Sequence, residues 1–194
     1  MPIWLPNVSR SWPLARHQRK VVWHPILLAA ILNHNQQRGP AEIPDKRRYS
    51  FSHLLRLAHD ENLRLLPPPG HPFNSLLPLR IAALRPEAEL ILHLYRACWK
   101  DGQAIDSESA LKALMDEDTL KRASTPEAKD KLKNNTQQAI ELGVFGVPTV
   151  VVDGELFWGF DSFAHLERFL RGQDPVDPKL TEIWENLPAS ASRV

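Results

Sequence analysis

The sequence predicts an α/β protein in which a small β-sheet is interrupted by a large all-helical insertion. A β-hairpin pattern lies around residue 150, an amphipathic helix follows it directly, and helical signals fill residues 26–142. The 194 residues suffice for one domain with a sizeable core. We therefore expect residues 1–33 and 143–172 to form the sheet domain, residues 34–142 the helical insertion and residues 173–194 a loosely attached tail.

The hairpin is predicted from two short β-prone runs that Asp153-Gly154 separates, after a helix that ends at Gly143. Pro148 cannot donate a ladder hydrogen bond, so it should stand at the start or at the exposed edge of its strand. We expect the Val147–Pro148 bond to be cis, because X-Pro bonds adopt cis at little cost. A cis bond at this step would present a free backbone amide and carbonyl to a ligand.

The other elements follow from periodicity, caps and breakers. Residues 20–23 are β-prone and should form a short strand. Helices are expected at residues 26–33, 44–61, 76–84, 87–100, 107–115, 125–142 and 162–170. The second of these has an expected inner face of Tyr49, Leu54, Leu55, Leu57 and Ala58. The proline-rich residues 66–72 should form a stiff loop, and Asn74 or Ser75 should cap the helix that follows.

Charge and hydropathy exclude several classes of partner. The 24 Lys and Arg residues balance 23 Asp and Glu residues, so the net charge of +1 favours neither nucleic acid nor an anionic membrane. The short basic run Lys46-Arg47-Arg48 is interpreted as one solvated helix face. No apolar run reaches the length of a membrane span, and the N-terminus lacks the apolar core of a secretory signal. We expect a cytoplasmic protein.

Cysteine usage limits the redox chemistry. A disulfide oxidoreductase needs two thiols at Cys-x-x-Cys spacing, whereas Cys98 is the only cysteine of the sequence. Cys98 continues the helical spacing of Leu90, Ile91 and Leu94, which predicts a core position. Any sulfur chemistry must then come from a bound thiol. The histidines show no metal-ligand spacing, so no metal site is expected.

Four segments resemble those of a known family in their order and in their amino-acid sequence. They are Trp23-His24-Pro25 with the helix after it, Pro72-Phe73-Asn74-Ser75, the run from Tyr95 to Trp99, and above all Val144-Phe145-Gly146-Val147-Pro148-Thr149 with the hairpin through Asp161. Together they resemble the 2-hydroxychromene-2-carboxylate isomerases and the kappa-class glutathione transferases. This resemblance implies a DsbA-like, thioredoxin-like fold with a helical insertion.

The resemblance also implies glutathione as the cofactor. The backbone at Val147 and Pro148 would pair with the extended tripeptide, Asp161 would hold its γ-glutamyl end, and Asn74 would line the same cleft. Asp161 and Asn74 also suit a second interpretation, in which each only caps the helix that follows it. Of the adjacent aromatic residues Phe157 and Trp158, at least one should belong to the core, because they alternate faces of a strand.

The N-terminus departs from the family pattern. Family members begin with a strand and a Ser-Pro turn whose hydroxyl hydrogen-bonds the glutathione sulfur, but no Ser-Pro step occurs here. Ser9 and Ser11 are the nearest candidates for the catalytic hydroxyl. Two explanations stay open: a truncated or wrongly started reading frame, and a divergence that removed the thiol site. A missing first strand would expose a sheet edge and favour a homodimer.

The functional prediction is a glutathione-dependent isomerase of 2-hydroxychromene-2-carboxylate-type compounds from aromatic catabolism, with a small-molecule substrate. Two alternatives remain, a kappa-type glutathione transferase or peroxidase and a catalytically inactive binding protein. The absent Ser-Pro turn favours the inactive protein, whereas the retained Val147-Pro148-Thr149 step and Asp161 favour an enzyme.

Overall fold

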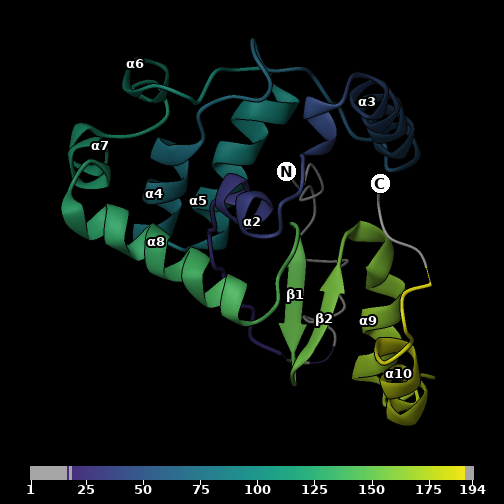
Figure 1. Ribbon diagram of the computed structural model, residues 1–194. Helices are drawn as coiled ribbons and strands as arrows, with labels where there is room; N and C mark the ends of the chain where they lie inside the picture. The colour runs from purple at the N-terminus through teal and green to yellow at the C-terminus, as the bar shows by residue number, and fades with distance from the viewer. Residues whose placement is uncertain (1–16, 18, 191–194) are drawn as a thin grey trace.

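A two-stranded antiparallel sheet lies between helices in the computed structural model, which describes residues 17 and 19–190 (Figure 1). Strand β1 (Thr149–Val152) pairs with strand β2 (Glu155–Trp158). The turn residues Asp153 and Gly154 both have positive φ, +51° and +90°, as a two-residue hairpin turn requires. The predicted hairpin is confirmed.

One face of the hairpin packs against α9 (Phe163–Leu170), which lies beside β2 in Figure 1. Val152 and Phe157 point to this face and are buried with Leu166, which has no exposed surface. The helix prediction for residues 162–170 is confirmed, with a 3₁₀ turn (Phe160–Ser162) before it.

The opposite face packs against α2 (Leu28–His34) and α8 (Pro126–Glu141). Leu156 of β2 contacts a cluster that contains the fully buried Ile31 and the nearly buried Ala139. Both helices confirm predictions, although α2 begins two residues later than expected. Helices therefore pack on both faces of the sheet, although Val151 and Trp158 on the second face stay exposed at 40% and 51%.

Two polar side chains of α8 fix the start of α2. The Leu27 amide donates to Thr136 Oγ1 at 3.1 Å, and Asn135 Nδ2 donates to the Pro25 carbonyl at 3.2 Å. Leu27 is the N-cap residue of α2 and has no side-chain cap of its own, so Thr136 supplies the cap from 109 residues further along the chain.

The remaining helices form the insertion around a core of their own. These helices are α3 (Pro44–Asp60), α4 (Leu76–Leu84), α5 (Ala88–Tyr95), α6 (Glu108–Leu111) and α7 (Glu117–Ala123), with a 3₁₀ turn at Pro40–Glu42 and a π-helical turn at Arg96–Lys100. Their core includes the fully buried Cys98, as predicted, together with Ile81, Trp99 and Leu111. The division of the chain into a sheet domain and an insertion stays a prediction.

The strand predicted at residues 20–23 does not belong to the sheet that the described residues form. The segment still alternates: Val21 and Trp23 pack on the α9 side of the hairpin, while Val22 is 61% exposed. The alternating pattern thus serves side-chain packing. The β-propensity of a segment indicates that its side chains fit a half-buried surface. It does not supply a neighbouring strand for backbone hydrogen bonds.

Three further differences concern the helices. Tyr49 and Leu55 were predicted on the inner face of α3 but are exposed, because the stripe that faces the protein instead runs through Phe51, Leu54 and Ala58. Within residues 107–115 only α6 is helical, and α7 was not predicted. The signal for α7 was Asp116, whose carboxylate accepts the Thr119 amide at 2.8 Å as an N-cap.

The predicted tail contains the helix α10 (Pro178–Glu185), and all of residues 171–190 are exposed. Among the residues that the structure describes, no helix is long and apolar enough to cross a membrane.

The loop of residues 66–74 is held to the insertion by an aromatic cage. The Leu66 amide donates to the Trp99 carbonyl at 2.8 Å. The His71 ring contacts Phe51, Trp99 and Phe73 edge-on, with ring centroids 5.4, 5.6 and 6.2 Å away. The His71–Pro72 bond is cis, which the sequence analysis did not predict. Burial in the cage lowers the pKa of His71, and the nearby Arg47 charge lowers it further.

The His71 cage predicts a pH dependence of stability. Because the folded pKa lies below the ordinary value of 6.5, the unfolded chain binds the proton more readily. The free energy of unfolding that the neutral His71 ring contributes is fully present above pH 6.5. It is lost as the pH falls from 6.5 through the lower pKa that His71 has in the folded protein. In urea unfolding between pH 5 and 8, we expect His71→Gln to flatten this decline. The exposed His93→Gln should keep the wild-type slope; equal slopes for all three proteins would contradict the prediction.

Candidate functional site

The loop between α8 and β1 presents the residues that the sequence analysis selected. The Val147–Pro148 bond is cis, as predicted. The Pro148 carbonyl accepts the Gly159 amide at 2.9 Å, which ties the loop to the end of β2. Thr149 Oγ1 donates to the Gly146 carbonyl at 2.8 Å and closes the loop from the other side. The loop conformation is thus held by two hydrogen bonds that do not use Val147.

Val147 keeps its own backbone groups available. Within the described part of the chain, neither its amide nor its carbonyl takes part in a hydrogen bond, and the residue is half-buried. An extended peptide can bind to such a position as an added strand, since a free amide and a free carbonyl lie on one residue.

Asp161 lies close to this loop because of the backbone of Gly159. Gly159 has φ +85° and donates its amide to Pro148. A Cβ atom at Gly159 would collide with Asp161 Oδ1, so the carboxylate lies directly over Gly159. The Asp161 side chain is exposed and makes no hydrogen bond to a described residue. Asp161 therefore does not cap α9 by a hydrogen bond, although it is an acidic residue of the 3₁₀ turn that leads into this helix. Its carboxylate lies next to the loop.

An aromatic pair covers the loop on one side. The Trp158 indole lies against Gly146, where a Cβ atom would collide with Nε1, and it contacts Phe145 with ring centroids 5.1 Å apart. Trp158 is 51% exposed, whereas its neighbour Phe157 is in the core. The prediction that at least one of the two belongs to the core is confirmed. The exposed pair of Phe145 and Trp158 was not predicted as part of the site. Its signal in the sequence was Gly146, a residue without a side chain, together with an aromatic residue at the end of the following hairpin.

The other predicted site residues are less directly connected to the loop. Asn74 is exposed, and its Oδ1 accepts the Leu76 amide at 3.1 Å at the start of α4, in agreement with its capping interpretation. Its amide nitrogen makes no hydrogen bond to a described residue. Ser9 and Ser11 lie outside the described residues. The structure thus brings together Val147, Pro148 and Asp161.

Cys98 is unsuited to thiol chemistry. Burial, together with the charge of Asp106, raises the pKa of Cys98 to about 12, so the thiolate is not populated near neutral pH. Within residues 17 and 19–190, no three His, Cys, Asp or Glu side chains gather as metal ligands would.

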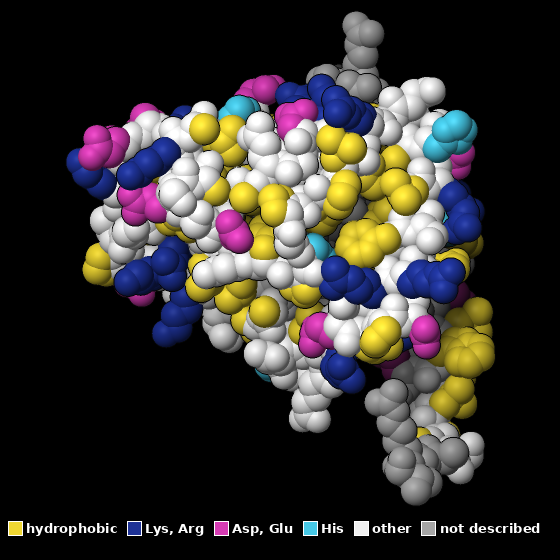
Figure 2. Space-filling model, turned by 90° about the horizontal axis from the view of Figure 1, so that it is seen from above, with side chains coloured by type: hydrophobic (Ala, Val, Ile, Leu, Met, Phe, Trp, Pro, Cys, Tyr) yellow, Lys and Arg dark blue, Asp and Glu magenta, His cyan; other side chains and the backbone are white. Residues whose placement is uncertain are grey.

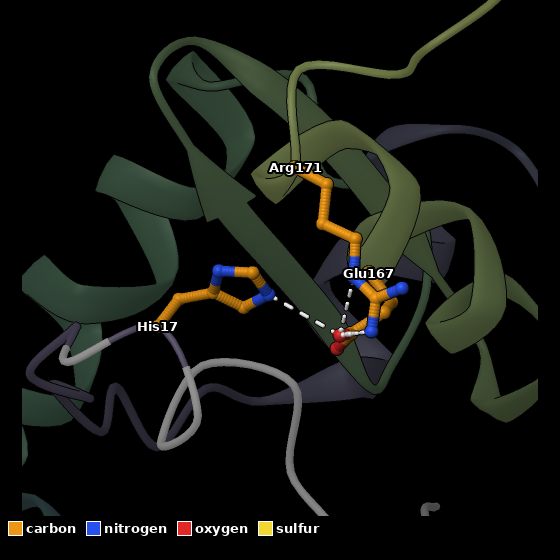
Figure 3. A network of polar contacts seen from close by, with 3 residues as sticks. All are labelled: His17, Glu167 and Arg171. Atoms are coloured by element: carbon orange, nitrogen blue, oxygen red, sulfur yellow. Dashed lines mark hydrogen bonds and ion pairs between the residues drawn. The ribbon is translucent and has the colours of Figure 1, made fainter.

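A charged network joins residue 17 to α9 (Figure 3). Glu167 Oε1 accepts His17 Nε2 at 3.2 Å and two Arg171 nitrogens at 3.1 and 2.6 Å. Desolvation raises the pKa of Glu167, but the hydrogen bonds from Arg171 and His17 outweigh this effect and lower it. The network positions the chain before Val21 against the helix that follows Asp161, so its role is structural.

The chain is similar to known proteins in sequence and in fold. Residues 5–171 match the model of the DSBA-like thioredoxin domain, so the match begins before Trp23, the first residue of the four segments that resemble the family. A 2-hydroxychromene-2-carboxylate isomerase from Pseudomonas sp. (strain C18) is 37% identical over an alignment of 86 residues, which covers 41% of this chain. This chain covers 40% of that protein's length.

A solved structure of a 2-hydroxychromene-2-carboxylate isomerase superimposes with a TM-score of 0.71 and 23% identity. The superposition covers 91% of this chain and 88% of that one, and it shows that the two share a fold. The thioredoxin-like fold with helical additions, predicted from the hairpin and the helices, is thereby confirmed. Since the family model matches most of the sequence, the chain belongs to the DsbA-like thioredoxin domain family.

Proposed function

We propose that this chain binds glutathione at the Pro148 loop and acts as an isomerase of 2-hydroxychromene-2-carboxylate-type compounds. The observation that carries the proposal is the free backbone of Val147 beside the unpaired carboxylate of Asp161. The local similarity to an isomerase from Pseudomonas sp. (strain C18) supports the choice of reaction.

The groups around the loop fit the chemistry of glutathione. The Val147 amide and carbonyl suit the backbone of an extended tripeptide. The Asp161 carboxylate suits the γ-glutamyl ammonium group, and a charge-assisted hydrogen bond of this kind is about twice as strong as a neutral one. Asn74 still has a free side-chain amide group that could donate to the same ligand.

Each residue has a defined task in the proposed reaction. When bound, glutathione supplies a thiol nucleophile, which the buried Cys98 cannot supply. The Val147 backbone and Asp161 hold both ends of the tripeptide and thereby orient it. Trp158 and Phe145, whose ring planes are inclined by 61°, present an exposed aromatic surface to an aromatic acid. Ser9 and Ser11 remain the candidates for a hydroxyl that favours the thiolate.

A glutathione-binding protein without isomerase activity is the second candidate. One specific observation favours it, since the sequence has no Ser-Pro step before residue 21. A kappa-type transferase would use the same groups on electrophilic substrates, so turnover assays must separate the three functions.

The binding site predicts a selective loss of affinity. In calorimetric titration of the full chain with glutathione, Asp161→Ala should weaken binding by about 1.5 to 3 kcal/mol, the usual range for a lost hydrogen bond to a charged group. Asp130→Ala removes an exposed carboxylate from α8 and is the matched control. Gly146→Ala should also weaken binding by displacing Trp158, whereas Gly70→Ala adds a methyl group to open space. Equal affinities for Asp161→Ala and Asp130→Ala would reject the role of Asp161.

The reaction itself is tested by a spectroscopic assay with 2-hydroxychromene-2-carboxylate. We expect conversion that requires both the protein and glutathione. Replacement of the operative serine, Ser9→Ala or Ser11→Ala, should slow it by two or more powers of ten if its hydroxyl stabilises developing charge. Conjugation of an electrophile such as 1-chloro-2,4-dinitrobenzene without isomerisation would point to a transferase. Glutathione binding without either turnover would identify a binding protein.

A further inference from the structure

The His71 ring fastens the loop of residues 66–74 to the insertion. It contacts Phe51 of α3, Phe73 of the loop itself and Trp99 of the π-helical turn, with ring centroids 5.4, 6.2 and 5.6 Å away. Phe51 and Phe73 also pack against the buried cluster that contains Trp99. The His71 ring is therefore the point at which the loop, α3 and the π-helical turn meet.

Few hydrogen bonds hold this loop. At one end the Leu66 amide donates to the Trp99 carbonyl at 2.8 Å, and at the other end the Asn74 side chain caps α4. Between these ends, no hydrogen bond joins residues 67–73 to another described residue. The middle of the loop is thus held by side-chain packing, in which the His71 ring contacts both α3 and the π-helical turn.

The cage suits a neutral imidazole and opposes a protonated one. His71 Nδ1 is buried without a hydrogen-bond partner among the described residues, and so is Trp99 Nε1, which can only donate. A protonated His71 would therefore place an N–H group and a positive charge where the described side chains offer no acceptor. Burial of an unpaired charge costs far more free energy than burial of a neutral ring.

Basic side chains around the cage add to this effect. The guanidinium carbon of Arg47 on α3 lies 5.6 Å from the centre of the Phe51 ring, so this ring already contacts one cation. The π-helical turn carries Arg96 and Lys100. Figure 2 looks onto the side where α3 lies, and Lys and Arg side chains border hydrophobic ones on the right half of that face.

No described carboxylate compensates for these charges at the His71 ring. The loop of residues 66–74 contains neither Asp nor Glu, and none of the ion pairs between described residues involves His71. Asp106 lines a small cavity of about 20 Å³ together with Phe73, but its charge acts on Cys98. Burial lowers the pKa of His71, and neighbouring basic groups lower it further.

We propose that His71 is an acid-sensitive latch, whose protonation releases the loop of residues 66–74 while the rest of the chain stays folded. Release separates the loop from the buried cluster of the insertion and gives solvent access to Cys98, a fully buried member of that cluster. It also moves Asn74, whose side chain holds the start of α4. Local openings of this kind need less free energy than global unfolding.

The direction of the pH dependence follows from the cage. The closed loop holds His71 at a pKa below the ordinary value of 6.5, so the open loop binds the proton more readily. The latch is therefore closed at neutral pH and opens as the pH falls below 6.5.

Hydrogen exchange of the wild-type full chain tests the latch without a substitution. The Leu66 amide reports on the loop, because it is bonded to Trp99, and the amide of the buried Leu132 in α8 reports on global unfolding. We expect the protection factor of Leu66 to fall between pH 7 and pH 5, by at most about tenfold for each pH unit because one proton drives the opening. It should stay below that of Leu132 throughout. Protection of Leu66 that does not fall, or that equals that of Leu132, would overturn the proposal.

The reactivity of Cys98 then assigns the opening to His71. Cys98 is the only cysteine, so its reaction with 4,4′-dithiodipyridine gives one rate, which is divided by the rate of the urea-unfolded chain at the same pH. We expect the corrected rate to rise from pH 7 to pH 5 in the wild type and in the exposed control His93→Gln. It should stay flat in His71→Phe, which keeps an aromatic ring that cannot be protonated.

Dilute urea separates local opening from global unfolding in the same assay. A local opening exposes little surface, so the rate should depend far less on urea than the global unfolding equilibrium does. A flat rate in the wild type, an equal rise in His71→Phe, or a urea dependence as steep as that of global unfolding would overturn the proposal.

Discussion

Packing of the β1–β2 hairpin against helices on both faces is the constraint on which the site depends. A two-stranded hairpin is at best marginally stable alone in water. Here Val152 and Phe157 pack against α9, and Leu156 packs between α2 and α8. The hairpin therefore joins helices from distant parts of the sequence and gives the loop before β1 a fixed position. The hydrogen bond from Gly159 to Pro148 then couples this loop to the residues after β2.

The candidate site follows from that coupling. Gly159 turns the chain in a left-handed conformation, which brings the Asp161 carboxylate over the backbone next to the loop. Val147 keeps a free amide and carbonyl because its neighbours Gly146 and Pro148 make the hydrogen bonds that hold the loop. The proposed binding site for an extended peptide with a charged end thus needs only one short loop and one carboxylate.

Sequence reasoning succeeded where the signal was local. Asp153-Gly154 predicted the hairpin turn from its chemistry, and Thr125 with Pro126 predicted the start of α8 from cap preferences. It failed where a residue's place depends on distant partners. The segment at residues 20–23 has strand-like alternation, but it is not a strand of the sheet that the described residues form, and Val21 and Trp23 pack beside the hairpin through their side chains. The exposure of Tyr49 and the contact of Trp158 with Gly146 likewise depend on tertiary packing, which periodicity does not contain.

The central claim is that glutathione pairs with the backbone of Val147. The most direct measurement is a titration of the ¹⁵N-labelled full chain with glutathione, followed by the amide signals of Val147 and of Val151, an exposed position on β1. We expect a saturable shift of the Val147 amide signal with the affinity found by calorimetry, and a much smaller shift at Val151. Binding that leaves the Val147 amide unchanged, or no binding at all, would contradict it.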